Sequence, residues 1–282
     1  MGLKEILAKH GFKFKKRFGQ NFITDPGILN KIVDVAEITK DDLVIEVGPG
    51  LGTLTKTIAE RAGRVITIEI DKDLIPILQE TLEGLDNVDV VEGDALKLNL
   101  DQLVLEKLGE LKPYKIVANL PYYITTPLIM HFLEEGYNVE RIVVMVQKEV
   151  AERIVANPGT KEYGALTVNL QLFTQAKIAF TVPRHVFTPK PDVDSAIVDL
   201  VVRKEPLYPI QDREFLRKII TAAFGQRRKT LLNSLGSLTI DKKILNEAME
   251  GINLDSRRRG ETLSLEEFVL LANGILQRLN NG

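Results

Sequence analysis

From residue 43 onward, short apolar runs typical of β-strands alternate with longer runs that have the periodicity of amphipathic helices. The first five strand-like runs lie at 43–47, 65–70, 88–91, 114–118 and 142–146. Helices are predicted between them at 54–61, 72–82, 100–108 and 127–134. This order predicts an α/β fold, with a mostly parallel sheet and helices on both faces. Because such sheets bind ligands beyond the carboxyl ends of their strands, the residues after each strand are the first candidates for a functional site.

The segment after the first predicted strand is a glycine loop, EVGPGLG, at 46–52. Glycines such as Gly48 and Gly50 let a backbone approach a ligand closely, and the helix that follows offers free N–H groups. The GxGxG spacing, preceded by the acid Glu46, differs from the dinucleotide fingerprint. The tighter loop suits a ligand without a pyrophosphate, and a cationic sulfonium with an amino-acid tail tolerates nearby acids.

Two further strand ends carry carboxylates. Glu69 ends the second strand, where a carboxylate can accept hydrogen bonds from both hydroxyls of a ribose. Asp94 follows the third strand beside the small Ala95, and it can accept a hydrogen bond from the adenine amine of a cofactor. Each acid alone is equally compatible with a solvent-facing loop. Ligand-type groups at the ends of three successive strands favour one shared site.

The fourth strand runs into the tetrapeptide Asn119-Leu120-Pro121-Tyr122. The side-chain oxygen of Asn119 can accept one N–H of an exocyclic amine, a backbone carbonyl near Leu120 or Pro121 can accept the other, and Tyr122 can stack on the base. Catalysis of this kind consists of positioning and electrostatics. A simple β-turn explains the tetrapeptide in isolation. Downstream of the glycine loop, it is the signature of methyl transfer from S-adenosylmethionine to the N6 amine of adenine.

The charge of the chain is unevenly distributed, although the formal net charge is only −2. Residues 1–17 and 213–230 carry six basic groups each, whereas residues 42–110 carry fifteen acidic and six basic groups. A polyanion would be drawn to the basic segments if folding gathers them, although solvated surfaces explain either cluster as well.

The chain has no cysteine and only three scattered histidines, His10, His131 and His185. We therefore expect neither disulfides nor a metal centre. No apolar run of 18 residues occurs, and no signal sequence is recognised. The sequence predicts a cytoplasmic protein.

The end of the chain differs from the rest. Two more strands are predicted at 177–182 and 196–202, as an antiparallel pair. A proline-containing linker at 204–209 is followed only by helical patterns, at 212–224, 228–235, 241–249 and 264–279, with Asp241 and Ser264 as N-caps. We predict an α/β domain at 1–206, with a basic arm at 1–24, and a small all-helical domain at 207–282.

Together these motifs resemble the KsgA family of ribosomal RNA adenine N6,N6-dimethyltransferases over nearly the whole chain. The matching segments are FGQNF (18–22), EVGPGLGTLT (46–55), EID (69–71), GDA (93–95), NLPYY (119–123), VFTPKPDVDS (186–195) and FGQRRKTL (224–231). The resemblance implies a Rossmann-like class I methyltransferase domain with a helical RNA-binding domain. The cofactor of this family is S-adenosylmethionine. The family's substrate is a pair of adjacent adenosines in the 3′-terminal hairpin loop of 16S rRNA, within the small ribosomal subunit or its precursor.

The resemblance also implies roles for individual residues. Phe187, on a rigid and exposed proline-rich loop, would stack on the target base opposite Tyr122. The cofactor site would comprise Asn21, Ile23, Gly48, Gly50, Glu69, Ile70, Asp94, Ala95 and Asn119. RNA contacts are predicted for Lys15, Lys16, Arg17, Arg227, Arg228 and Lys229. We expect a monomer with a part in small-subunit biogenesis. One departure is Gly260, where family members commonly have proline.

Other functions share parts of this pattern. The sister family that dimethylates large-subunit rRNA, and confers macrolide resistance, has the same fold and amine clamp, but its members tend to be strongly basic. DNA adenine methyltransferases usually carry Asp-Pro-Pro-Tyr instead of Asn-Leu-Pro-Tyr. A mainly non-catalytic ribosome assembly factor would not need an intact cofactor set, and a small-molecule methyltransferase would leave the basic segments unexplained.

Overall fold

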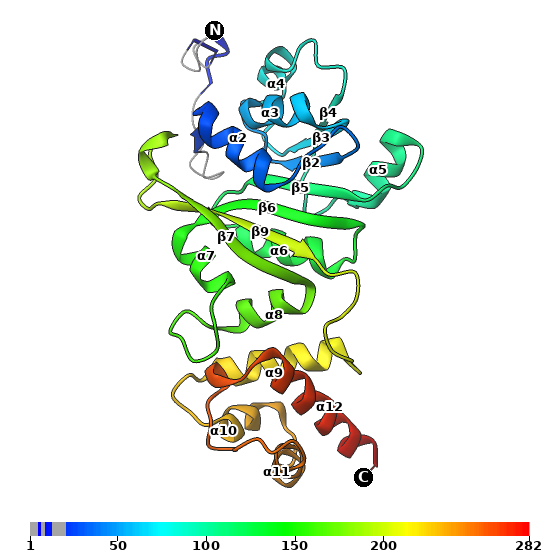
Figure 1. Cartoon of the computed structure of the whole chain (residues 1–282), viewed down its shortest axis with the longest axis vertical. Helices are drawn as coiled ribbons and strands as arrows, with labels where there is room; N and C mark the ends of the chain where they lie inside the picture. The colour runs from blue at the N-terminus through cyan, green and yellow to red at the C-terminus, as the bar shows by residue number, and fades with distance from the viewer. Residues whose placement is uncertain (1–4, 7–8, 13–20, 282) are drawn as a thin grey trace. The chain divides into compact units, whose positions relative to one another are not determined.

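The computed structural model describes residues 5–6, 9–12 and 21–281. The chain forms two compact units, whose elements are labelled in Figure 1. Unit 1 comprises Met1–Ala151 and Lys177–Val202, and unit 2 comprises Glu152–Ala176 and Arg203–Gly282. The sequence analysis placed all of 1–206 in one domain. Residues 152–176 instead belong to unit 2, because the helix within them packs against the C-terminal helices.

The largest sheet in the described part of the chain has seven strands, in the order β4-β3-β2-β5-β6-β9-β7 (Figure 1). From β4 to β6 the neighbouring strands are parallel, and β9 pairs antiparallel to β6. The strands are β2 (Leu43–Val47), β3 (Arg64–Glu69), β4 (Val88–Glu92), β5 (Tyr114–Asn119), β6 (Val139–Gln147), β7 (Thr174–Val182) and β9 (Ser195–Val202).

The order of the strands reverses at β2, which lies between β3 and β5 and is parallel to both. The chain adds β3 and β4 on one side of β2, then returns to add β5 and β6 on the other. A reversal of this kind leaves a crevice at the carboxyl ends of the strands. It also places the loop after β2 beside the segment after β5, since Val47 pairs with Ala118.

Helices α2 (Pro26–Val35) and α3 (Thr53–Arg61) pack against each other and cover one face of this sheet. Alternate strand residues point to that face, and they form an apolar cluster with both helices that includes Val44, Val65, Val117 and Val143. The Asp25 carboxylate caps the start of α2, because it accepts a hydrogen bond of 2.9 Å from the Ile28 amide. Further helices are α4 (Ile75–Thr81), α5 (Leu100–Leu108), α6 (Thr125–Glu134) and α7 (Lys148–Ile154).

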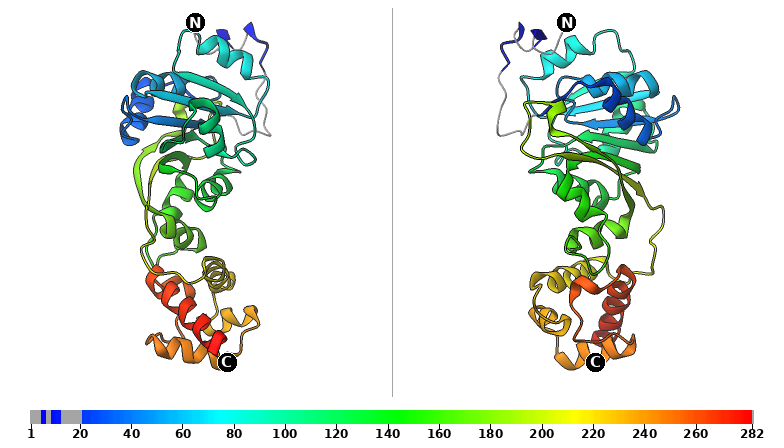
Figure 2. Two further views of the ribbon diagram at one scale, coloured as in Figure 1. Left: turned by 90° about the vertical axis from the view of Figure 1, so that its right-hand side faces the viewer. Right: turned by 60° about the vertical axis from the view of Figure 1, so that its left-hand side comes forward.

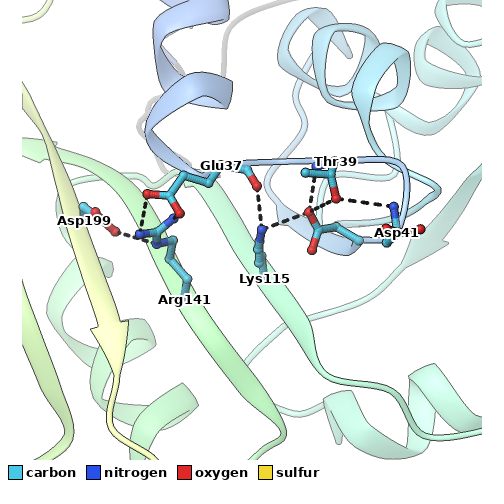
Figure 3. A network of polar contacts seen from close by, with 7 residues as sticks. Glu37, Thr39, Asp41, Lys115, Arg141 and Asp199 are labelled. Carbon is cyan, nitrogen blue, oxygen red and sulfur yellow. Dashed lines mark hydrogen bonds and ion pairs between the residues drawn. The ribbon is translucent and has the colours of Figure 1, made fainter.

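A polar network attaches the segment after α2 to the sheet (Figure 3). Arg141 of β6 donates a hydrogen bond of 2.9 Å to Glu37 and lies 3.2 Å from the buried carboxylate of Asp199 on β9. Lys115 of β5 donates to the Glu37 carbonyl at 2.7 Å and to Asp42 at 2.9 Å. The hydrogen bond from Arg141 lowers the pKa of Glu37. The connection from α2 to β2 is therefore held directly by β5 and β6, and it is joined to β9 only through Arg141.

A second, very small sheet joins two segments that are far apart in the sequence. Strands β1 (Phe22–Ile23) and β8 (Phe187–Thr188) pair antiparallel, with Ile23 opposite Phe187. The side chains of Ile23 and Phe187 belong to the apolar cluster of α2 and α3. This pairing fixes the chain just before α2 to the proline-rich loop between β7 and β9, which also contains the short helix η2 (Arg184–Val186).

Unit 2 is helical, and Figure 2 shows it from two further sides, from green through yellow to red. Its core includes Tyr163, Phe224 and Phe268, with ring centroids 5.8 Å apart in both contacting pairs. The predicted N-cap Ser264 is confirmed and is part of a capping box: the Ser264 amide donates to Glu267 at 2.8 Å, and the Glu267 amide donates to Ser264 Oγ at 3.2 Å. The helices are α8 (Ala165–Phe173), α9 (Arg213–Gly225), α10 (Leu231–Leu235), η3 (Gly236–Leu238), α11 (Lys242–Gly251), η4 (Gly260–Thr262) and α12 (Leu265–Asn281).

Gly260, at the position where the resembling family commonly has proline, lies against α9 with no room for a side chain. A Cβ at this position would lie 2.6 Å from the carbonyl oxygen of Ala223. Gly260→Ala is therefore expected to destabilise the protein by about 1–3 kcal/mol, because the backbone has to shift. Thermal unfolding of the full chain measures the effect. Gly236→Ala is the matched control, since a Cβ there meets no atom within 4 Å, and equal melting temperatures of the two variants would contradict the prediction.

Candidate functional site

A pocket opens at the carboxyl ends of the central strands of unit 1 and is closed on one side by residues 21–23. It brings together most of the residues that the sequence analysis assigned to the cofactor and the target amine. These are Asn21, Ile23, Gly48, Gly50, Glu69, Ile70, Asp94, Ala95, Asn119, Leu120, Pro121 and Tyr122. Each follows or ends a strand, as expected from the topology, except Asn21 and Ile23, which reach the pocket through β1.

The glycine loop borders the pocket with a backbone that side chains would disturb. Gly48 has a φ of +70°, and a Cβ on it would meet no atom within 4 Å, so it would project into open space. Gly50 has a φ of +59°, and a Cβ there would lie 2.7 Å from the ring of Phe22. Positive φ and the packed aromatic ring both favour glycine at these positions.

The N–H groups of the three glycines in this loop are engaged within the protein. Gly48 donates to the carbonyl of Ile68 at 2.9 Å, Gly50 to the carboxylate of Glu69 at 3.2 Å, and Gly52 to the carbonyl of Pro49 at 2.9 Å. A loop that binds phosphate keeps such N–H groups directed at the anion. The geometry therefore supports the inference from spacing that the ligand has no pyrophosphate.

Glu69 is a buried acid at the end of β3. Its carboxylate accepts hydrogen bonds from the Gly50 amide and, at 2.8 Å, from the Asp71 amide. Burial raises its pKa to about 6, so the group is mostly ionised at neutral pH. Each carboxylate oxygen has a further lone pair. Glu69 can therefore accept two donors from a ligand, such as the adjacent hydroxyls of a ribose.

Glu46 also lines the pocket, and the sequence analysis did not assign it a role. Its side chain is 1% exposed and accepts a hydrogen bond of 2.5 Å from Thr55. Burial raises its pKa to about 8, and the negative charge of Glu69 adds to this effect. The sequence feature that could have identified Glu46 as a pocket residue is its position as an acid on the strand just before the glycine loop. Other lining residues without an assigned role are Phe22, Val47, Pro49, Thr53, Leu54, Ile68, Leu74, Gly93, Tyr123, Ile124 and Leu128.

Asn119 lies at the end of β5 with its side chain oriented by the N-terminal segment. Its Nδ2 donates a hydrogen bond of 2.9 Å to the backbone carbonyl of Asn21. With the nitrogen bound in this way, Oδ1 is the atom of the amide that can accept a hydrogen bond from a ligand.

The structure also distinguishes between the two backbone carbonyls that the sequence left open. The carbonyl of Pro121 accepts hydrogen bonds from the Ile124 amide and from the Thr125 hydroxyl, both at 3.1 Å. Two donors occupy both lone pairs of that oxygen. The carbonyl of Leu120 is therefore the better acceptor for the second N–H of an amine.

The two aromatic residues assigned to the target base differ in exposure. Tyr122 is half-buried and lines the pocket, and its hydroxyl lies 2.8 Å from the hydroxyl of Ser195. Phe187 is 3% exposed, does not line the pocket and packs in the cluster of α2 and α3. The prediction that Phe187 lies on an exposed loop is wrong, because the pairing of β8 with β1 directs this side chain into the core.

Of the basic residues assigned to RNA, the three that the structure describes, Arg227, Arg228 and Lys229, do not line the pocket. The guanidinium of Arg227 donates to the carbonyls of Lys161 at 2.7 Å and Tyr163 at 2.9 Å. It therefore links the segment after α9 to the segment before α8 within unit 2. Arg228 and Lys229 are exposed. Lys15, Lys16 and Arg17 lie outside the described residues.

A second basic segment lies beside Arg228 and Lys229, and the sequence analysis did not recognise it. The Leu231 amide donates to the Arg258 carbonyl at 2.7 Å, which brings the loop 226–230 next to the loop 255–259. The latter adds the exposed cation Arg259. We refer to Arg228, Lys229 and Arg259 as the basic patch.

Two negative findings concern only the described residues. Within them, no group of three or more His, Cys, Asp or Glu side chains is placed to hold a metal ion. No helix among them is both long enough and apolar enough to cross a membrane.

Comparison with solved structures identifies the fold as a Rossmann-like class I methyltransferase fold. A dimethyladenosine transferase from Plasmodium falciparum is 30% identical, with a TM-score of 0.75, and the match covers 92% of this chain and 98% of that one. The 23S rRNA methyltransferase ErmE is 28% identical, with a TM-score of 0.69, and the match covers 91% of this chain and 100% of that one.

Curated sequences are more similar still. A protein named ribosomal RNA small subunit methyltransferase A, from Clostridioides difficile, is 50% identical over 279 residues, which cover 99% of this chain and 96% of the relative. The protein of the same name from Streptococcus sanguinis is 51% identical over 276 residues, which cover 96% of this chain and 95% of the relative. The family model for ribosomal RNA adenine dimethylases matches residues 11–275. This chain therefore belongs to the ribosomal RNA adenine dimethylase family.

Proposed function

We propose that this enzyme transfers methyl groups from S-adenosylmethionine to the N6 amines of two adjacent adenosines in the 3′-terminal hairpin loop of 16S rRNA, giving N6,N6-dimethyladenosines. The observation that carries the proposal is the orientation of Asn119. Its amide nitrogen is bound to Asn21, which leaves its oxygen as an acceptor in the same pocket as the glycine loop. Unit 1 would carry out the transfer, and unit 2 would contribute to RNA binding.

The residues of the pocket fit this cofactor. Glu69 would accept hydrogen bonds from the ribose hydroxyls, and Asp94 from the adenine amine, with Ile70 and Ala95 as apolar neighbours of the ring. The loop at Gly48 leaves open space where a side chain would otherwise project. The cofactor, when bound, supplies an electrophilic methyl group on a positively charged sulfur.

The protein's own part in the transfer is to prepare a weak nucleophile. The lone pair of an adenine N6 is delocalised into the ring, so the amine must be held in a geometry that favours attack. Asn119 Oδ1 and the Leu120 carbonyl would accept its two N–H groups, while Tyr122 stacks on the ring. Positioning of this kind acts through orientation and fixed dipoles, without a covalent intermediate. The proton can leave to water after the methyl has been transferred.

The choice of the small subunit rests on the relatives. Full-length sequences with about half of their residues identical are named small-subunit methyltransferases, whereas the 23S rRNA methyltransferase is only 28% identical. The test is incubation of the protein and labelled S-adenosylmethionine with undermethylated small subunits, large subunits and duplex DNA in parallel. Mass spectrometry of nuclease fragments should find dimethyladenosine in the 3′ hairpin of the small-subunit rRNA. Label confined to large-subunit rRNA or to DNA would refute the proposal.

The basic patch is expected to contribute to RNA affinity by neutralising phosphates. None of its three side chains has an ion pair or hydrogen bond with another residue in the part of the chain that the structure describes. Replacing Arg228, Lys229 and Arg259 together by alanine should weaken binding to small subunits. It should also lower the slope of log affinity against log salt by about 1 for each phosphate that is no longer neutralised. Filter binding at several salt concentrations measures both quantities.

The control for this variant is the pair Lys242→Ala and Lys243→Ala, which removes exposed cations from α11 in the same unit. Affinity and salt slope should then stay close to those of the wild type. Equal losses in the two variants would mean that net charge, and not the patch, governs binding.

A further inference from the structure

Tyr122 is attached to a buried residue from a distant part of unit 1. Its hydroxyl lies 2.8 Å from Oγ of Ser195, which begins β9 and is fully buried. The residues that follow Ser195 on β9 form the mainly apolar run 196–202. A buried hydroxyl in such surroundings needs a hydrogen-bond partner, and an alanine would have filled the core without that need. The partner is the tyrosine that borders the pocket.

The position of Ser195 is fixed by the sheet and not by the loop before it. Ser195 pairs with Gln147 in the antiparallel ladder of β6 and β9. One step further, the Lys148 amide donates to the Asp194 carbonyl at 3.0 Å. Oγ of Ser195 is therefore a fixed point beside the hydroxyl of Tyr122.

Tyr122 is also held at its backbone. The preceding residue, Pro121, has a fixed φ, and its carbonyl accepts hydrogen bonds from the Ile124 amide and the Thr125 hydroxyl. The ring is thus held at both ends, at Cα by this turn and at the hydroxyl by Ser195. Burial raises the pKa of Tyr122, so its hydroxyl keeps its proton at physiological pH and can take part in this bond.

We infer that Ser195 is a positioning residue, which holds the ring of Tyr122 at the angle at which it stacks on the target adenine. This inference rests on the proposed function. A ring that is already fixed loses no rotational freedom when the base arrives, and a small misplacement of a positioning group is costly for the rate. The chain thus orients both sides of the amine clamp from a distance, Asn119 through Asn21 and Tyr122 through Ser195.

The test removes the bond from either end. Tyr122→Phe keeps the aromatic face, and Ser195→Ala keeps the packing of the core. Each variant should lower kcat for methyl transfer on small subunits by about fivefold, the effect of one hydrogen bond. KM for the particle and Kd for S-adenosylmethionine should stay within about twofold of the wild type, because no contact to either ligand is removed. The double variant should be no slower than either single variant, since all three lack the same bond.

A matched control separates positioning from mere stabilisation. Tyr114 lies at the other end of β5, and its hydroxyl donates to Asp101 at 2.8 Å. Tyr114→Phe removes a comparable bond and should lower the melting temperature without changing kcat. The inference is overturned if Tyr122→Phe keeps the wild-type kcat, if the two single effects add in the double variant, or if Tyr114→Phe slows transfer equally.

The outcome also separates this inference from the proposed function. If the wild type forms no dimethyladenosine on small subunits, the proposed function fails. If the wild type is active and Tyr122→Phe is equally active, only the role of Ser195 fails. Should Ser195→Ala not fold, Tyr122→Phe decides alone, because it removes the same bond from the half-buried partner.

Discussion

Replacement of Asn119 by alanine is expected to lower kcat by about 100- to 1,000-fold, the range seen when one preorganised polar group is removed from a reacting centre. The side-chain oxygen would no longer accept an N–H of the target amine, and the lone pair would lose its orientation. The link to Asn21 would disappear as well. Single-turnover transfer from labelled S-adenosylmethionine to small subunits measures the rate.

Binding of the cofactor should survive this substitution. Gly48, Glu69 and Asp94 remain in place, so Kd for S-adenosylmethionine, measured by calorimetry, should change by less than about tenfold. Asn138→Ala is the matched control, because this exposed asparagine lies outside the pocket just before β6. If Asn119→Ala keeps more than a tenth of the wild-type kcat, the assignment of the amine clamp is wrong.

Substitution of Glu46 by glutamine is expected to change how the stability of the ligand-free protein depends on pH. The pKa of Glu46 is raised from 4.5 to about 8 by burial, so the folded protein binds one proton more than the unfolded chain between these pH values. The free energy of unfolding therefore contains a contribution that is fully present below pH 4.5 and is lost as pH rises to about 8. For a shift of this size the loss is about 3–5 kcal/mol.

Glutamine cannot ionise, and its side-chain oxygen can still accept the hydrogen bond from Thr55. Glu46→Gln should therefore lack this loss and be more stable than the wild type at pH 8.5, as measured by urea unfolding between pH 5 and pH 9. Glu60→Gln, which changes an exposed glutamate on α3, is the control and should follow the wild type. Parallel curves for the wild type and Glu46→Gln would show that Glu46 is not a buried, proton-binding group.

The regular part of the fold could be predicted because its signals are local. Each strand from β2 to β6 is a short apolar run, and each intervening helix shows its own periodicity, so α5 and β2 match the predicted ranges and the others differ by a few residues at their ends. The order of the strands was not predicted, but the carboxyl ends of parallel strands lie at one edge of a sheet, and this rule placed the segments after β2 and β5 at the same edge. This is why residues such as Gly48 and Asn119 could be assigned to one pocket from the sequence alone.

The elements that were missed depend on contacts between distant residues. In α8 the residues 166–172 alternate between apolar and polar, which is typical of a strand. The segment is nevertheless helical, and Val168 is buried in the core of unit 2. Strands β1 and β8 have only two residues each, too few to show any periodicity. Their pairing places Ile23 at the pocket and Phe187 in the core, so the sequence could not indicate that Phe187 is buried.

Within the site, the sequence predicted which residues meet but not how they are oriented. The hydrogen bonds that fix the Asn119 amide and fill the lone pairs of the Pro121 carbonyl are visible only in three dimensions. The same holds for the contact of Tyr122 with Ser195, which joins residues 73 positions apart. These orientations determine which atoms of the site can accept hydrogen bonds and how the ring of Tyr122 is held.

The division of unit 2 between two stretches of the chain affects the order in which a nascent polypeptide can mature. Residues 152–176 leave the ribosome before α9 and α12, the helices on which α8 packs. Until those helices are synthesised, apolar side chains such as Val168 lack the C-terminal residues that cover them in the folded unit. Exposed apolar surface of this kind is what chaperones bind. Premature termination near residue 206 would therefore release an aggregation-prone fragment, and not an independently folded catalytic domain.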